Sequence, residues 1–202
     1  MHRAAPCRSV PVTSTLDLMR RRTLVAFAGA VATVIPALAS MPAPIPLRQL
    51  YAMARTVAVV EVLEGRVVSA GGDTCGARYR GRVIEATKNT TVGATVDFGY
   101  LPQLKVGAAY LVLLGDLSEV PIPELPDFQV RCQAVLPSAA MLAHWRGAME
   151  ISGDTSAPEK RASWTVRPAK YVIYPLGTRT TVVDGEKQLW FSDLVKRMSE
   201  GP

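Results

Sequence analysis

The sequence predicts a small, mainly β domain that folds as a Greek-key barrel with a few short helices, one of them at the C-terminus. Three observations lead to this fold class. Short runs of β-branched and aromatic residues recur from residue 57 onward, and most of them alternate apolar with polar positions. Turn-forming pairs such as Gly71-Gly72 and Asp184-Gly185 separate some of these runs. The last run leads into an amphipathic stretch after Ser192.

Residues 1–39 predict a secretory signal peptide. Three arginines, Arg20 to Arg22, precede a mostly apolar run that ends in the small-x-small sequence Ala37-Leu38-Ala39. Such a leader directs export to the periplasm or to the outside of the cell, and its cleavage would leave Ser40 as the first residue. Met19 is an alternative start of the chain, because a complete leader follows it.

An uncleaved membrane anchor is the alternative to a cleaved leader. The apolar run from Thr23 to Ala39 is shorter than the roughly 20 residues of a transmembrane helix, and it contains Pro36. We therefore expect no membrane span once the leader is removed. The pair Arg21-Arg22 also resembles a twin-arginine signal, but arginine pairs are common in ordinary leaders, so a Sec-type leader is favoured.

The positive charge of the chain lies mainly in this leader. The whole chain carries a formal net charge of +6, from 23 lysines and arginines against 17 acidic residues. Residues 1–39 hold five arginines and one aspartate, which leaves 18 basic and 16 acidic residues in the rest of the chain. A mature chain so close to neutral does not favour nucleic acid as a partner.

Two cysteines, Cys75 and Cys132, remain after the leader and predict one disulfide in an oxidising compartment. Alternation of apolar and polar residues places both cysteines on inward faces, which agrees with a bond between them. A pair of buried free thiols is the alternative. The cysteines and His144 lack the spacing of metal ligands, so neither a metal site nor a cofactor is predicted.

Residues 40–56 are interpreted as a proline-rich linker followed by one or two helical turns at residues 47–54. Residues 57–70 form a β-rich run, in which we expect a bulge or bend at Gly65. A turn at residues 70–73 then leads into the next strand.

Residues 75–86 predict a strand with one buried face, because two sets of side chains alternate along it. The inward set is Cys75, Ala77, Tyr79, Gly81 and Val83, and the outward set is Arg78, Arg80 and Arg82.

Four further segments belong to the barrel core, which is assigned to residues 57–136. Residues 92–100 predict a strand, and the continuous apolar run 110–114 predicts a central strand buried on both sides. Residues 116–127, rich in proline and acidic residues, predict an exposed loop. Residues 128–135 alternate again and predict a strand. The inward residues of this last strand are Val130, Cys132 and Ala134.

Residues 137–202 are expected to complete the same domain. Ser138 is predicted to cap a short helix that ends before Gly147. A β-rich stretch follows at residues 164–174, and the Asp-Gly turn predicts a β-hairpin over residues 180–191. Ser192 is predicted to cap the terminal helix.

Four of these segments together resemble a known family. They are residues 57–70 (VAVVEVLEGRVVSA), 75–88 (CGARYRGRVIEATK), 92–100 (VGATVDFGY) and 104–114 (LKVGAAYLVLL). The pattern is similar to that of exported bacterial proteins with a domain like the tissue inhibitors of metalloproteinases, the netrin-type, OB-like barrel. The resemblance implies a fold rather than a function. It does not carry over inhibition, because those inhibitors bind the protease zinc through an N-terminal cysteine, which this chain lacks after the leader.

One group of cations is the candidate binding site: Arg78, Arg80 and Arg82, with Lys88 just beyond them and Arg131 as a further member. In an OB-like barrel this strand lies near the face that binds oligonucleotides and oligosaccharides. Guanidinium groups about 7 Å apart along a strand suit phosphates or carboxylates. The alternative is an ordinary solvent face, on which the arginines pair with carboxylates of neighbouring strands. These carboxylates are Glu61, Glu64 and Asp97.

No catalytic residue is predicted. The chain after the leader has one histidine, His144, and it contains no GxSxG, GxGxxG or Walker motif. We expect an exported, non-enzymatic module that binds an envelope protein, an anionic glycan or a lipid headgroup. The alternatives are an envelope hydrolase with an unrecognised site and a structural subunit of an envelope assembly.

Overall fold

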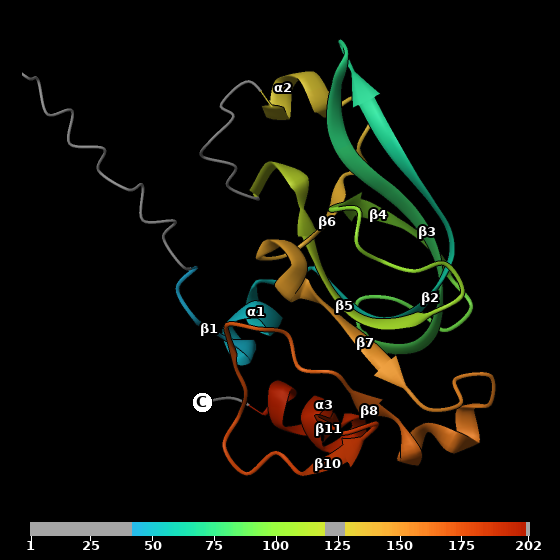
Figure 1. Ribbon diagram of the computed structural model, residues 1–202, viewed down its shortest axis with the longest axis vertical. Helices are drawn as coiled ribbons and strands as arrows, with labels where there is room; N and C mark the ends of the chain where they lie inside the picture. Colours follow the sequence, from blue (N-terminus) through green and yellow to red (C-terminus); the bar gives the residue numbers. More distant parts are fainter. Residues whose placement is uncertain (1–41, 120–127, 201–202) are drawn as a thin grey trace, which may run out of the picture. The chain divides into compact units, whose positions relative to one another are not determined.

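The structure is a computed structural model that describes residues 42–119 and 128–200 (Figure 1). The predicted signal peptide, residues 1–39, and residues 120–127 of the predicted loop lie outside the described residues. The strands are β1 (Ile45–Pro46), β2 (Thr56–Ala70), β3 (Asp73–Lys88), β4 (Thr95–Tyr100), β5 (Ala109–Asp116), β6 (Ala139–Met141), β7 (Ala148–Ser152), β8 (Thr165–Val166), β9 (Val172–Ile173), β10 (Thr180–Val183) and β11 (Glu186–Trp190). The α-helices are α1 (Leu47–Met53), α2 (Phe128–Cys132) and α3 (Phe191–Ser199), and the 3-10 helices are η1 (Leu117–Glu119), η2 (His144–Gly147) and η3 (Pro158–Ser163).

Five strands form a closed barrel, which confirms the predicted mainly β, OB-like fold class. β2 pairs antiparallel with β3, and β3 pairs antiparallel with β4. β5 pairs antiparallel with both β2 and β6. β4 and β6 pair in parallel, with Gly99 opposite Ala140, and this contact closes the barrel. The order β2-β3-β4-β6-β5 around the barrel is a Greek key, because β5 pairs with β2 instead of the preceding β4, and β6 then lies between β4 and β5.

The barrel interior is filled by apolar side chains from all five strands. Alternation places these residues on one face of each strand, as the sequence predicts for β3. They are Ala58, Val60, Val62, Ala77, Tyr79, Val83, Phe98, Tyr110, Val112, Leu114 and Met141.

A second core lies outside the barrel. β5 also pairs with β7, and the sheet continues through β8 and β11 to β10. Leu111 and Leu113 of β5 belong to this outer core, whereas Val112 and Leu114 belong to the barrel interior. The predicted central strand, buried on both sides, is therefore confirmed. Leu47 and Leu50 of α1, with Leu194 and Met198 of α3, are buried in the same outer core.

The C-terminal hairpin and helix are present as predicted. β10 and β11 pair antiparallel, with Val183 opposite Glu186. Asp184 and Gly185 between them have φ values of 51° and 78°, which suit the type I′ turn that Asp-Gly favours. The cap prediction is wrong: α3 begins at Phe191, before Ser192, and no side-chain hydrogen bond caps it. Its N-terminal Phe191 is buried, so packing rather than a cap fixes the start of this helix.

A disulfide joins Cys75 and Cys132, as predicted, with their Cα atoms 5.5 Å apart. Cys75 lies near the start of β3, and Cys132 ends α2. Both are buried against Tyr100, Leu117 and Leu136 in a third, smaller apolar cluster. The bond therefore ties α2 to the β3 end of the β2–β3 hairpin turn.

The predicted strand at residues 128–135 is wrong. Residues 128–132 form α2, and turns follow it. Val130 is 79% exposed and Ala134 is exposed, so of the three residues expected to point inward only Cys132 is buried. Alternation over a few residues does not distinguish a strand from a single helical turn when no neighbouring strand pairs with it.

The prediction of a helix from Ser138 to Gly147 is also wrong for residues 139–141. Residues 139–141 form β6, the fifth barrel strand, and only residues 144–147 are helical, as η2. The carbonyl of Ser138 accepts a hydrogen bond from the N–H of Leu117, so this residue continues the pairing toward β5 instead of capping a helix. Pairing with β4 and β5 outweighs the helix propensity of the Ala-Ala-Met sequence.

Candidate functional site

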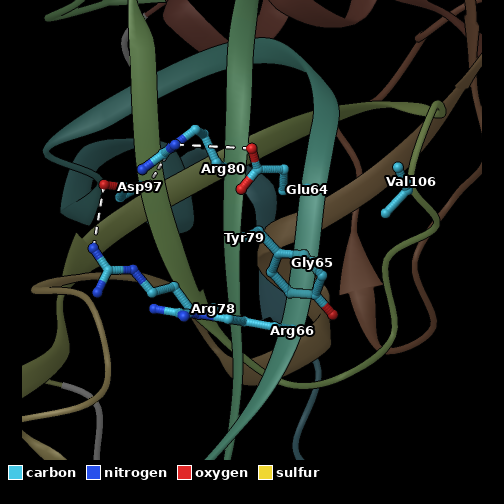
Figure 2. Close-up of a pocket in the computed structure, with 8 residues that line it drawn as sticks. All are labelled: Glu64, Gly65, Arg66, Arg78, Tyr79, Arg80, Asp97 and Val106. Atoms are coloured by element: carbon cyan, nitrogen blue, oxygen red, sulfur yellow. Dashed lines mark hydrogen bonds and ion pairs between the residues drawn. The ribbon is translucent and has the colours of Figure 1, made fainter.

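A groove of about 540 Å³ lies on the outer face of the barrel across β2, β3 and β4 (Figure 2). We call it the arginine groove. Its lining residues are Glu64, Gly65, Arg66, Arg78, Tyr79, Arg80, Asp97 and Val106. β3 and β4 are the second and third strands of the barrel, which is the region that OB-like barrels use for ligands.

Strand register brings the charged groups together. On the ladder between β2 and β3, Glu64 lies opposite Arg80 and Arg66 lies opposite Arg78. On the next ladder, Arg80 lies opposite Asp97 of β4. Residues opposite one another point to the same face of a sheet, so all five side chains share the outer face.

A bulge in β2 directs Glu64 and Arg66 to this face. Val62 lies opposite Gly81 and points into the barrel, but the register shifts before Glu64, which lies opposite Arg80. Leu63 is the extra residue, two positions before the bulge expected at Gly65. Without the shift, even-numbered residues would continue to point inward, because side chains alternate along a strand. Alternation along the sequence therefore does not place Arg66 on this face, because the bulge is visible only in the strand register.

Gly65 and Tyr79 also line the groove, although the Tyr79 ring belongs to the barrel interior, opposite Gly65. A Cβ atom on Gly65 would lie 3.0 Å from two atoms of the Tyr79 ring, so the ring packs on bare backbone (Figure 2). The Tyr79 hydroxyl donates to the carbonyl of Leu101 at 2.8 Å and accepts from the N–H groups of Gln103 and Leu104 at 2.9 and 3.1 Å. These bonds fix the Tyr79 ring to the loop between β4 and β5.

Two of the three arginines share one carboxylate. Nη2 of Arg78 lies 3.3 Å from Oδ2 of Asp97, and Nε of Arg80 lies 3.4 Å from Oδ1 of the same residue. Nη1 of Arg80 also lies 3.8 Å from Oε1 of Glu64. These side chains are between 36% and 71% exposed, so each ion pair contributes only about 0–1 kcal/mol and can be exchanged for another anion.

Arg66 forms no ion pair with any carboxylate in the part of the chain that the structure describes. Its side chain reaches across β3 and lies beside Arg78 (Figure 2). Like charges directly opposite one another destabilise a sheet. The groove thus holds three guanidinium groups against two carboxylates, with one guanidinium available to a ligand.

The other predicted site residues lie apart from the groove. Nη2 of Arg82 lies 2.6 Å from Oε2 of Glu61. This ion pair is the one expected if the arginines form an ordinary solvent-exposed face. Lys88 donates to the carbonyl of Tyr51 at 3.0 Å at the end of α1. Arg131 pairs with Asp73 at 2.6 Å beside the hairpin turn. The structure therefore gathers Arg78 and Arg80 of the predicted set, and adds Arg66.

His144 is fixed by a buried neighbour. The hydroxyl of Tyr100 and Nδ1 of His144 are 2.7 Å apart, and Tyr100 is 7% exposed. His144 and the preceding Ala143 have φ values of 60° and 49°. This hydrogen bond therefore joins β4 to the start of η2, where the backbone turns in a left-handed conformation.

Shifted pKa values occur at turns and packing contacts away from the groove. The backbone N–H of Arg179 and then the Arg197 guanidinium lower the pKa of Asp193, which lies in the first turn of α3. Hydrogen bonds from Lys160 and Ser156 lower the pKa of Asp154, and bonds from Ser118 lower that of Asp116. Burial raises the pKa of Tyr174 to about 12. Each shift has a structural hydrogen bond or burial as its cause.

Comparisons of the chain with family models, with curated proteins and with solved structures give no match. Within residues 42–119 and 128–200, no helix has both the length and the apolar content to cross a membrane. In the same residues, no three His, Cys, Asp or Glu side chains gather where a metal ion could be held.

Proposed function

We propose that the protein is an exported, non-enzymatic binding module whose arginine groove takes an anionic group of an envelope component. The group is a phosphate or carboxylate carried by a lipid headgroup, a glycan or a partner protein. The OB-like barrel supplies the rigid face, and Arg66, Arg78 and Arg80 supply the donors.

The observation that carries this proposal is the placement of Arg66 directly opposite Arg78. Two guanidinium groups side by side repel each other, so the free protein keeps an arrangement that costs stability. An oxyanion between them removes the repulsion and accepts hydrogen bonds from both. Asp97 is already shared by two arginines, so it does not neutralise the pair.

The mutational test compares the groove with an arginine outside it. We expect R66Q to weaken binding by about tenfold and R66Q/R78Q by more, because each loses charge-assisted hydrogen bonds to the anion. R82Q is the matched control, since Arg82 lies on the same strand face but pairs with Glu61. Binding is measured by titration against phosphatidylglycerol vesicles and against polygalacturonate, which separate a phosphate source from a carboxylate source.

Binding should also weaken as salt is added, because the side chains are exposed. Equal affinity of R66Q/R78Q and the unaltered protein for the probe that binds would remove the groove from consideration. Failure of both probes at low ionic strength would count against an anionic envelope component as the ligand.

Export is supported by the leader pattern of residues 1–39 and by the disulfide between buried cysteines. Intact mass, measured without reductant on protein from fractionated cells, checks both. We expect a chain that begins near Ser40 and is two protons lighter than its reduced form. A full-length chain recovered from the cytoplasm would contradict the proposed export.

A further inference from the structure

The distal half of β2 has a free edge. β2 pairs with β5 only from Thr56 to Glu61, and the backbone of Val62 then bonds to Gly107 and Ala108. From residue 63 to residue 70, no strand among the described residues pairs with β2 on the side away from β3. Figure 1 shows this part of the β2–β3 hairpin extending past the other barrel strands. An unpaired strand edge is a ready template for another strand.

This free edge carries exposed apolar side chains. Leu63 is 43% exposed and Val67 is 62% exposed. Val106, on the adjacent loop, is 60% exposed and lies 3.8 Å from the position of a Cβ on Gly65. Soluble strands protect such an edge with lysine, proline, other charged side chains or a bulge. Residues 63–70 contain neither lysine nor proline, and their two charges, Glu64 and Arg66, are of opposite sign.

The sequence of the edge is complementary to itself. Residues 63–67, Leu-Glu-Gly-Arg-Val, read apolar, acidic, glycine, basic and apolar. In an antiparallel pairing of two copies around an axis at Gly65, Leu63 faces Val67 of the second copy, and Glu64 faces Arg66 of the second copy. Opposite charges and apolar pairs directly across a ladder are both stabilising.

We propose that two copies of this chain associate through residues 63–67 of β2, antiparallel around a two-fold axis at Gly65. The interface is isologous, so each contact occurs twice. The missing side chain of Gly65 lets the two backbones approach at the axis. Glu64 of each copy approaches Arg66 of the other, which has no carboxylate partner among the described residues of its own chain.

Pairing of the two edges would join the two arginine grooves on one sheet face. Each groove keeps three arginines against two carboxylates, so the joined face stays cationic. The association therefore goes beyond the proposed binding function and does not depend on it. A protein that dimerises but binds no anion, and one that binds anions as a monomer, are distinguishable results.

Sedimentation velocity across a range of protein concentrations tests the association. A five-residue edge is smaller than a standard interface, so we expect a reversible dimer with a dissociation constant on the order of 10–100 µM. E64R and R66E each place like charges opposite one another twice, and should each raise this constant by about tenfold or more. A mixture of E64R with R66E brings arginine opposite glutamate at both positions, so it should recover the dimer.

Recovery in the mixture separates a direct contact from a folding defect in either variant. V182K on β10, another edge strand of the sheet with Val182 69% exposed, is the matched control and should leave the dimer unchanged. A monomer at every concentration would overturn the proposal. So would a dimer that survives both single variants, a mixture that stays monomeric, or a dimer lost in V182K.

Discussion

The two halves of the β2–β3 hairpin are both β-strands, but their surroundings differ. In the proximal half, residues 56–62 of β2 lie between β3 and β5, and Val57 to Val60 are completely buried. In the distal half, residues 63–70 pair with β3 alone, and most of them are exposed. β-branched residues occur in both halves. The difference teaches that pairing with a third strand, rather than β propensity, decides which half is buried and which is exposed.

The register shift at Leu63 marks the boundary between the two halves. Before it, Val60 and Val62 face the barrel interior; after it, Glu64 and Arg66 face outward. A single extra residue therefore converts a core-forming strand into one that carries charged groups to the groove.

Removal of the disulfide is expected to have the largest effect, because this bond ties the distal half to α2. The variant C75A/C132A should lose about 4 kcal/mol of unfolding free energy, since the bond closes a loop with a sequence separation of 57. Urea unfolding measures the loss. Amide hydrogen exchange should rise more in residues 63–76 than in residues 56–62.

Reduction of the unaltered protein, followed by blocking of the thiols, is the control for the substitutions themselves. A loss below about 1 kcal/mol would mean that the distal half holds its place without the bond. Equal rises in amide hydrogen exchange in residues 63–76 and 56–62 would show that the bond does not stabilise the distal half more than the proximal half.

Two valine-to-alanine substitutions on β2, one in each half, are expected to have the next largest effect on the free energy of unfolding. Val60 is completely buried in the barrel, whereas Val67 is 62% exposed. V60A should cost about 2 kcal/mol of unfolding free energy, from lost apolar burial and the cavity left behind. V67A should change it by less than about 0.5 kcal/mol when measured on dilute, monomeric protein. Similar costs for the two would show that the distal half is as well packed as the proximal half.

Local sequence patterns predict much of this fold, because residue spacing within one segment shows which side chains of that segment share a face or form a turn. Alternation along residues 75–86 places Cys75 and Tyr79 inward and Arg78 and Arg80 outward, and the structure agrees. Asp184-Gly185 predicts its hairpin because few residues adopt two successive positive φ angles.

The wrong predictions lie where pairing with distant strands, or the lack of it, decides the local structure. Residues 139–141 have helix-forming side chains but pair with β4 and β5, because the barrel needs a fifth strand to close. Residues 128–135 alternate like a strand but find no strand partner in the described chain, and α2 forms instead.

For the candidate site, the sequence identified Arg78, Arg80 and the carboxylates available to pair with them. It did not identify Arg66, because the bulge at Leu63 becomes visible only in the register between β2 and β3. The predicted site also included Lys88 and Arg131 with these arginines, although their partners hold them near α1 and the hairpin turn.

The sequence by itself determined the β class, the inward position of Cys75, the outward position of Arg78, Arg80 and Arg82 and the terminal hairpin, since each depends on the spacing of residues within one segment. The tertiary structure alone decided barrel closure, the groove that adds Arg66 to Arg78 and Arg80, and the free edge of β2. The groove depends on the register between β2 and β3, and the free edge depends on where β2 stops pairing with β5. Both are set by packing between segments far apart in the chain, which local periodicity does not record.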